Sequence, residues 1–221
     1  MSFDRDGFEI KRKFVSNKII EAIKSEVGNR IKDNTNYGIR KANQKFKTID
    51  ALAHSAKFLS LAELMLGSSA KVVRVIYFDK TPDKNWLVSW HQDKTIAVNK
   101  RVKVTGWGAW SVKEKTHHVQ PSVEVLNSMV TFRVHLDDAD KNNGCLKVIP
   151  ESHQLGILSH IEITKAVTDI KPVLCEAKAG DLLLMKPHIL HSSSKSMIPK
   201  HRRVVHIEYS NYSLPMDLEW A

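Results

Sequence analysis

The sequence has 221 residues, of which 42% are hydrophobic and 26% are charged. This composition is typical of a globular protein and excludes a disordered chain. Two cysteines, Cys145 and Cys175, are too few for a disulfide framework or a zinc cluster. No apolar run approaches the ~20 residues that cross a bilayer, and no signal sequence is recognisable, so we expect no membrane span and a cytoplasmic location.

The formal net charge is +10. Such a charge would suit a nucleic-acid or membrane-surface partner. The Lys and Arg residues are, however, spread along the chain, and the densest basic stretches lack the interleaved aromatic residues of a base-stacking platform. We therefore interpret the charge as a solvated surface and expect a small-molecule substrate in preference to nucleic acid.

The first 70 residues predict helices. Ser16 is a candidate N-cap, and a second helix is expected from Thr48 to Leu66, ending at Gly67. The apolar residues of the first helix recur at helical spacing: Ile19, Ile20, Ile23, Val27 and Ile31. Residues 30–46 between the helices are polar and are expected to be irregular. Both helices are amphipathic, which favours a role as cover for a larger apolar surface.

From Lys71 onward the pattern predicts short strands separated by turns, with no helices between them. The expected strands are 71–78, 86–90, 129–136, 146–149, 173–176, 181–186 and 204–209. A turn is expected at 81–83. This order favours antiparallel sheets in a sandwich or barrel. We expect one domain over 1–221, with helical cover in 1–70 and a β core in 71–212.

The tripeptide His91-Gln92-Asp93 carries the clearest chemistry. Residues i and i+2 of a strand point to the same face, so His91 and Asp93 can share one metal. His191 is the best later histidine to complete a set of two histidines and one carboxylate. Such a set holds Fe(II) on one face and leaves three positions open, which suit a chelating keto acid and O₂.

Arg202 follows His191 by eleven residues and opens the last strand. Its guanidinium can pair in bidentate fashion with the distal carboxylate of 2-oxoglutarate, and Ser193 can add a hydroxyl contact. Arg203 is the alternative if the register is shifted by one residue. Alternation favours Arg202, because it places that residue on one face with Val204, His206 and Glu208.

At these residues the chain resembles the phytanoyl-CoA dioxygenase-like branch of the Fe(II)/2-oxoglutarate oxygenases. The motifs that carry the resemblance are residues 90–95, 118–121, 136–138, 143–150 with 152–153, and 180–181 through 191–193 to 202. The resemblance implies a double-stranded β-helix (a jelly-roll or cupin-like barrel) that is mostly β with additional helices. It also implies that His91, Asp93 and His191 bind iron and that Arg202 and Ser193 hold 2-oxoglutarate.

The resemblance also bears on the reaction. The halogenases of this family have a small residue in place of the carboxylate, so Asp93 favours hydroxylation. Repair demethylases of the superfamily usually carry a second arginine six residues after the first, whereas this chain has Glu208 there. A basic nucleic-acid-binding oxygenase, and a cupin-type metal-binding protein that does not use 2-oxoglutarate, remain the alternative hypotheses.

Other histidines are weaker candidates. His188 is a rival ligand that strand parity turns away from His191. His117 and His118 are expected to be solvated in a long loop over 99–120, which is a candidate lid carrying two tryptophans. His153 is expected to bond to backbone.

Four further residues are candidates for substrate contact. Arg133 and His135 alternate with apolar residues on one strand, so they face either a wet functional pocket or solvent; we favour the pocket. Arg74 and Glu208 are weaker candidates of the same kind. This polar set favours a small polar or carboxylate-bearing substrate.

Overall fold

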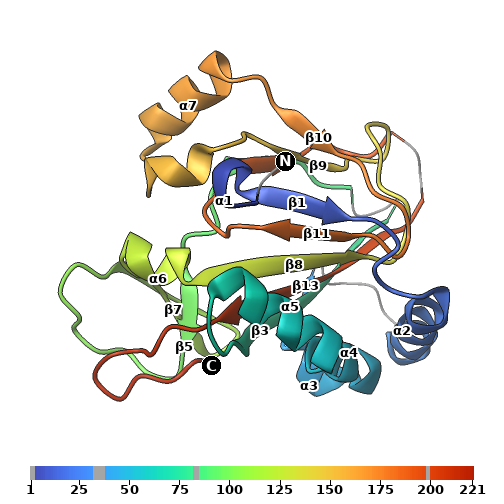
Figure 1. The fold of residues 1–221 in the computed structure, drawn as a ribbon, viewed down its shortest axis with the longest axis horizontal. Coiled ribbons are helices and arrows are strands. Elements are labelled where there is room, and N and C mark those ends of the chain that lie inside the picture. The colour runs from blue at the N-terminus through green and yellow to red at the C-terminus, as the bar shows by residue number, and fades with distance from the viewer. Residues whose placement is uncertain (1–2, 32–37, 82–84, 198–199) are drawn as a thin grey trace.

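The structure is a computed structural model that describes residues 3–31, 38–81, 85–197 and 200–221. Its centre is formed by antiparallel sheets stacked on each other (Figure 1). The six-stranded sheet has the order β1 (Phe8–Lys11), β11 (Leu182–Met185), β8 (Met129–His135), β13 (Arg202–Ser210), β3 (Lys71–Lys80), β2 (Gly38–Arg40). The four-stranded sheet has the order β10 (Val173–Cys175), β9 (Leu146–Val148), β12 (His191–Ser193), β4 (Val88–His91). A smaller sheet has the order β5 (Ile96–Val98), β7 (Thr116–Gln120), β6 (Gly108–Lys113). The expected mostly-β jelly-roll with helices is confirmed.

One face of the six-stranded sheet is largely apolar, whereas the other carries polar side chains on β8, β13 and β3 and is apolar on β1 and β11. On β8, Phe132 and Val134 pack into the largest hydrophobic cluster, which also contains residues of the helices α2 (Asn17–Arg30), α4 (Lys47–Ala53) and α5 (Ala56–Leu66). Figure 1 shows these helices along the outer side of this sheet. The alternate residues of β8, Thr131, Arg133 and His135, therefore face the interior between the sheets.

The expected helices are present, with differences in detail. α2 buries Ile20, Ile23 and Val27 as predicted, whereas Ile19 is 40% exposed and the Ser16 side chain makes no capping hydrogen bond. The single helix expected over 48–66 is divided into α4 and α5. Ser55 adopts an extended backbone, and its hydroxyl donates to the Leu52 carbonyl oxygen at 2.8 Å, which interrupts the helix.

Several short elements were not expected from the sequence. They are α1 (Phe3–Asp6), β1, β2, α3 (Ala42–Lys45), β5, β6, β7, α6 (Val123–Asn127), the 3-10 turn η1 (Ser152–Leu155) and α7 (His160–Asp169). The expectation of no helices among the strands was therefore wrong, and α7 begins with a capping box formed by Ser159 and Glu162. Most of the expected loop 99–120 is the β6–β7 hairpin, and 30–46 contains β2 and α3. The turn predicted at 81–83 lies largely outside the described residues.

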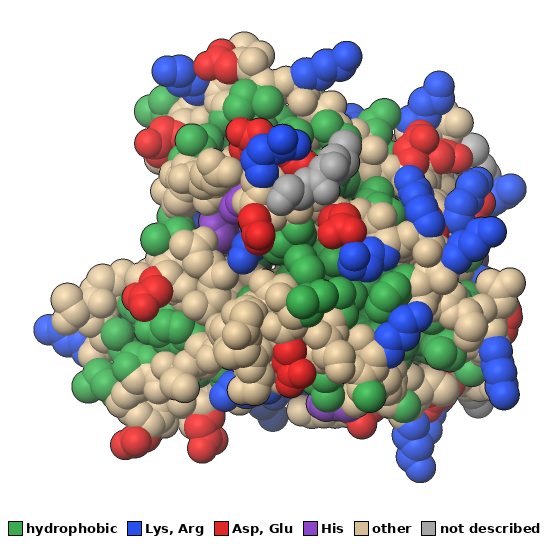
Figure 2. Space-filling model, viewed as in Figure 1, with side chains coloured by type: hydrophobic (Ala, Val, Ile, Leu, Met, Phe, Trp, Pro, Cys, Tyr) green, Lys and Arg blue, Asp and Glu red, His purple; other side chains and the backbone are tan. Residues whose placement is uncertain are grey.

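The surface agrees with the view of dispersed charge. On the face shown in Figure 2, Lys and Arg side chains are distributed around the molecule with Asp and Glu side chains between them. Within the described residues, no helix combines the length and the apolar character that a membrane span requires.

Candidate active site

Two histidines face each other across neighbouring strands. His91 ends β4, His191 begins β12, and the two residues are cross-strand partners whose rings lie 4.2 Å apart. Each Nδ1 atom lies 2.8 Å from a backbone carbonyl oxygen, that of Ser89 for His91 and that of Ile189 for His191. These contacts place the proton on Nδ1 and leave both Nε2 lone pairs available to a metal.

Asp93 completes the group from the segment after β4. Its two carboxylate oxygens lie 3.7 Å from His91 Nε2 and 3.6 Å from His191 Nε2. The Asp93 backbone N–H donates to the Pro187 carbonyl oxygen at 3.0 Å. Because the strand ends at His91, this bond, and not strand alternation alone, directs Asp93 into the site.

The Gln92 side chain anchors the backbone between His91 and Asp93. Its amide donates to the carbonyl oxygens of Gly156 and His188, and its side-chain oxygen accepts from the Leu158 N–H at 2.8 Å. Gln92 is buried, so these bonds hold the His91-Gln92-Asp93 segment in one conformation.

The three donor atoms fit a divalent transition metal. One ligand atom from each of His91, Asp93 and His191 lies within 4.8 Å of the others. Burial raises the pKa of Asp93, but the favourable interactions of its carboxylate with His191, His91, His206 and Arg74 outweigh burial and hold that pKa below its usual range. Burial lowers the pKa of His191 to about 4, so the imidazole stays neutral and able to bind metal. Two imidazole nitrogens and one carboxylate are the donor set of facial Fe(II) sites.

His91, Asp93 and His191 line a cavity, and a cluster of cations lines another part of it. The Lys80 ammonium donates to the Ser193 hydroxyl at 2.9 Å and to the Ser194 carbonyl oxygen at 2.8 Å, and Arg202 Nη2 lies 3.4 Å from the Ser193 hydroxyl. The Ser193 hydroxyl itself donates to the Gly144 carbonyl oxygen. Arg202 is 6% exposed, and its Nε and Nη1 atoms have no hydrogen-bond partner among the described residues. Buried, unsatisfied guanidinium donors of this kind fit a carboxylate ligand.

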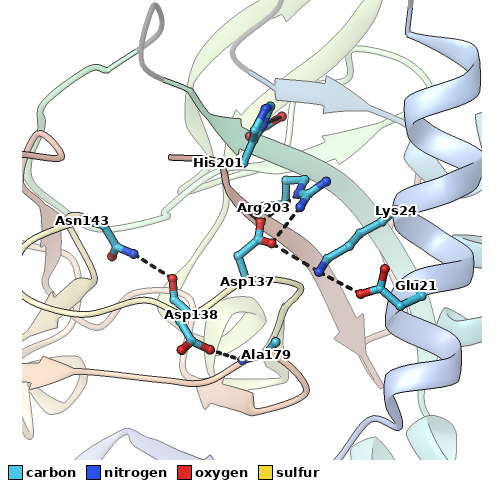
Figure 3. A network of polar contacts seen from close by, with 9 residues as sticks. Glu21, Lys24, Asp137, Asp138, Asn143, Ala179, His201 and Arg203 are labelled. Atoms are coloured by element: carbon cyan, nitrogen blue, oxygen red, sulfur yellow. Dashed lines mark hydrogen bonds and ion pairs between the residues drawn. The ribbon is translucent and has the colours of Figure 1, made fainter. Parts of the chain in front are cut away.

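The Arg203 side chain points away from the cavity, toward Asp137 and helix α2. Its guanidinium donates to both carboxylate oxygens of Asp137 at 2.8 Å, and Lys24 of α2 lies 3.4 Å from the same carboxylate (Figure 3). Arg203 is therefore engaged on the helix-facing side of β13, and Arg202 is the arginine that faces the cavity, as alternation predicted.

Three of the four candidate substrate residues, Arg74, Arg133 and Glu208, form a buried polar chain with His206. Arg133 Nη1 donates to His206 Nδ1 at 3.0 Å, His206 Nε2 donates to Glu208 at 3.0 Å, and Arg74 donates to the same Glu208 oxygen. Arg133, Arg74 and His206 line the cavity, whose volume is about 330 Å³. Glu208 is buried beneath them, and His135 is fully buried without lining the cavity.

The remaining histidines differ in placement. His188 is buried with its ring 6.1 Å from that of His153, away from the His91–Asp93–His191 group, and His153 Nε2 lies 3.1 Å from the Asp4 carbonyl oxygen. Both placements agree with the expectations. His118 is 3% exposed on β7, so the expectation that it is solvated was wrong. The sequence pattern predicts a loop over the β6–β7 hairpin because these strands are short and lack a long apolar alternation.

Six polar residues that line the cavity were not among the residues predicted from the sequence: Arg40, Lys80, Thr95, Lys113, His118 and His206. Lys80 lies just beyond the strand expected over 71–78, because β3 continues for two residues after Phe78. Extending the alternation from Arg74 through Ile76 and Phe78 would have placed Lys80 on the same inward face. His206 shares its face with Arg202 and Glu208 and could have been found by the same argument.

Comparison with known proteins identifies the family. A sequence profile described as "Phytanoyl-CoA dioxygenase (PhyH)" matches residues 3–204. The chain belongs to the phytanoyl-CoA dioxygenase family. This is a family of oxygenases that use Fe(II) and 2-oxoglutarate, and these are the cofactors of the domain described here.

Two curated relatives match parts of the chain. A methylphosphonate hydroxylase of Gimesia maris is 27% identical over 115 residues, which cover 49% of this chain and 42% of that protein. Phytanoyl-CoA dioxygenase 1 of Oryza sativa subsp. japonica is 32% identical over 80 residues, or 32% of this chain and 28% of that protein. The matched parts thus span less than half of either relative.

Solved structures share the fold over nearly the whole chain. AviO1 from Streptomyces viridochromogenes has a TM-score of 0.72 at 21% identity, covering 97% of this chain and 94% of that one. EctD from S. alaskensis, solved with 2-oxoglutarate and 5-hydroxyectoine, has a TM-score of 0.73 at 18% identity, covering 94% of this chain and 73% of that one. At these identities the likeness establishes the double-stranded β-helix fold.

Proposed function

We propose that this chain is a hydroxylase that oxidises a small polar or anionic molecule, coupled to conversion of 2-oxoglutarate and O₂ into succinate and CO₂. One oxygen atom of O₂ enters succinate and the other becomes the new hydroxyl group. The observation that carries the proposal is the convergence of His91, Asp93 and His191 in one cavity with the buried cations Lys80 and Arg202.

His91, Asp93 and His191 would hold the iron. When bound, Fe(II) supplies the O₂ and electron-transfer chemistry that no protein side chain provides. The chain's own contribution is orientation. The backbone carbonyls of Ser89 and Ile189 fix the tautomers of the two histidines, and the Pro187 carbonyl fixes Asp93.

Arg202, Lys80 and Ser193 would hold the distal carboxylate of 2-oxoglutarate. Arg202 Nε and Nη1 are available as donors, and Lys80 adds a second positive charge at the same hydroxyl. Ser193 lies two residues after His191 on β12, so the carboxylate site and the metal site are built on one strand. This spacing supports binding of an extended dicarboxylate between them.

The remaining lining supports a polar or anionic substrate. Arg74, Arg133 and His206 also line the cavity. Arg74 and His206 both bond to Glu208, and Arg133 bonds to His206. The methylphosphonate hydroxylase relative is named for an anionic substrate, which agrees with this charge. Glu208 stands where nucleic-acid demethylases carry a second arginine, and its pairing with Arg74 disfavours the nucleic-acid alternative.

The test is anaerobic addition of Fe(II) and 2-oxoglutarate to the purified protein, followed by succinate measurement in air. We expect a weak visible charge-transfer band and slow succinate release. Both should be lost in Asp93→Ala and in His191→Ala. His188→Gln is the matched control, because it alters a buried neighbouring histidine that lies outside the group.

Iron binding without a charge-transfer band and without succinate, in a folded protein, would contradict the proposal and favour a cupin-type metal-binding protein. Steeply salt-dependent binding to single-stranded or duplex nucleic acid would favour the nucleic-acid alternative instead.

A further inference from the structure

A second cavity of about 380 Å³ adjoins the one that contains the metal-binding group. Three side chains line both cavities: Arg40 of β2, Arg74 of β3 and His118 of β7. We call these three residues the cavity junction. They come from three separate strands, and none of them contacts the Lys80–Arg202 cluster through a hydrogen bond in the described structure.

The cavity junction contains buried polar atoms without partners. Arg74 uses Nη2 to bind Glu208, but its Nε has no partner among the described residues, and the same holds for both ring nitrogens of His118. Buried donors that lack partners are rare in native proteins and indicate a missing ligand or water. Arg40 Nη1 donates to Glu114 at 2.6 Å, and both side chains are partly exposed.

The charge around the junction is strongly positive. The first cavity is lined by six Lys or Arg side chains (Arg40, Arg74, Lys80, Lys113, Arg133 and Arg202), against the single acidic residue Asp93. The second cavity adds Lys41 and Lys45, against Glu114. Burial and the charges of Arg74, Lys113 and Arg40 lower the pKa of His118 to about 4, while Glu208 opposes them weakly. Glu208 and Glu114 pair with Arg74 and Arg40, so the excess of positive charge comes from the other lining cations, Lys41, Lys45, Lys113 and Arg133. An excess of positive charge around unpartnered donors attracts an anion.

We propose that the cavity junction binds an oxyanion group of the substrate, a phosphonate, phosphate or carboxylate. The second cavity then receives whatever lies beyond that group, and the carbon to be oxidised lies toward Asp93. The assignment of the bound anion to the substrate rests on the proposed function. The existence of the anion site does not depend on that function.

The distances favour a small substrate. Arg74 is bonded to Glu208, and a Glu208 carboxylate oxygen lies within 4.8 Å of ligand atoms of Asp93 and His206. An anion bound to Arg74 would therefore lie near the metal-binding group, with the Glu208 carboxylate between them. A molecule of a few carbon atoms can span this distance.

The experiment is isothermal titration of the Fe(II) protein under anaerobic conditions with methylphosphonate and, separately, with acetate. Saturating 2-oxoglutarate is present so that Arg202 and Lys80 are occupied. We expect Arg40→Gln and His118→Gln each to weaken methylphosphonate binding about tenfold, because each removes a donor to a charged group. Glu114→Gln should tighten binding, because Glu114 competes with the anion for Arg40.

Lys115→Gln is the matched control. It removes one positive charge from the same β6–β7 hairpin but lies outside both cavity linings, so binding should stay within about twofold. Arg40 and Glu114 are partly exposed, so their variants are expected to fold even if His118→Gln does not. The melting temperature of each variant is measured alongside.

Binding that is weakened by Arg40→Gln and strengthened by Glu114→Gln supports the proposal, and the tighter of the two probes indicates the acid group of the substrate. Absence of binding by both probes at millimolar concentration overturns it, as does equal binding by wild type and all variants. The titration is repeated without iron and 2-oxoglutarate. If the protein forms no charge-transfer band, but Arg40→Gln still weakens and Glu114→Gln still strengthens anion binding, the proposed function is refuted and the anion site is supported.

Discussion

Replacement of Arg202 by Gln tests which of two adjacent arginines, Arg202 or Arg203, binds 2-oxoglutarate. Arg202 faces the cavity and is 6% exposed, with two nitrogens that lack partners. Arg203 faces the helices and is bonded through two nitrogens to Asp137. The Arg203→Gln variant removes the same charge one position away and is therefore a matched control.

The expected magnitude follows from these contacts. A buried hydrogen bond to a charged group contributes about 1.5–3 kcal/mol, and a guanidinium forms two such bonds with a carboxylate. Lys80 remains beside the Ser193 hydroxyl in the variant and retains part of the attraction. We therefore expect Arg202→Gln to reduce the free energy of 2-oxoglutarate binding by about 3 kcal/mol, which raises the dissociation constant by about two orders of magnitude.

The assay is titration of the anaerobic Fe(II) protein with 2-oxoglutarate, followed through the charge-transfer band, together with a thermal melt. Arg203→Gln should keep its affinity within about twofold and lose about 1 kcal/mol of folding stability, because its ion pair with Asp137 is partly exposed. The reasoning would be refuted if Arg203→Gln weakened 2-oxoglutarate binding and Arg202→Gln did not.

Three further outcomes are expected. Asp93→Ala and His191→Ala should reduce succinate formation to background with melting temperatures close to wild type; turnover retained in either variant would remove that residue from the metal site. Lys80 has a pKa lowered to about 7 by burial and by neighbouring arginines, and a bound dicarboxylate would raise it. Affinity for 2-oxoglutarate should therefore be constant below pH 7 and fall as the pH rises above it, whereas Lys80→Met should show a flat pH profile; an unchanged slope in Lys80→Met would assign the effect elsewhere. Tyr209→Phe should cost about 1–2 kcal/mol in urea unfolding, because the hydroxyl donates to the buried Ala53 carbonyl oxygen at 2.7 Å; a loss near zero would mean that this carbonyl finds another donor.

Local patterns in the sequence were sufficient to predict which side chains face the centre of the site. Strand alternation placed Arg202 inward and Arg203 outward, and it placed Arg133 on the face opposite Phe132. The approach of His91 to His191 could be anticipated from the residue types, although they are 100 positions apart. Their cross-strand register depends on which strands pair, and no local pattern contains that information.

The parts that were missed depend on tertiary context. β5 has three residues, and β6 carries polar residues on a half-exposed hairpin, so neither has the long apolar alternation that identifies a strand. His118 therefore could not be placed beside Arg74, and the cavity junction had no sequence signal as a unit. The roles of His91, Asp93, His191, Arg202 and Ser193 in binding remain proposals that the experiments above address.

The placement of β1 has a practical consequence for handling this protein. Residues Phe8–Lys11 pair with the whole of β11, whose sequence Leu182–Met185 is apolar and fully buried. Removal of the first dozen residues would leave β11 as an open edge of the six-stranded sheet, with free backbone donors and acceptors beside exposed leucines. Such an edge recruits strands from other molecules. Amino-terminal trimming is therefore expected to cause aggregation during expression.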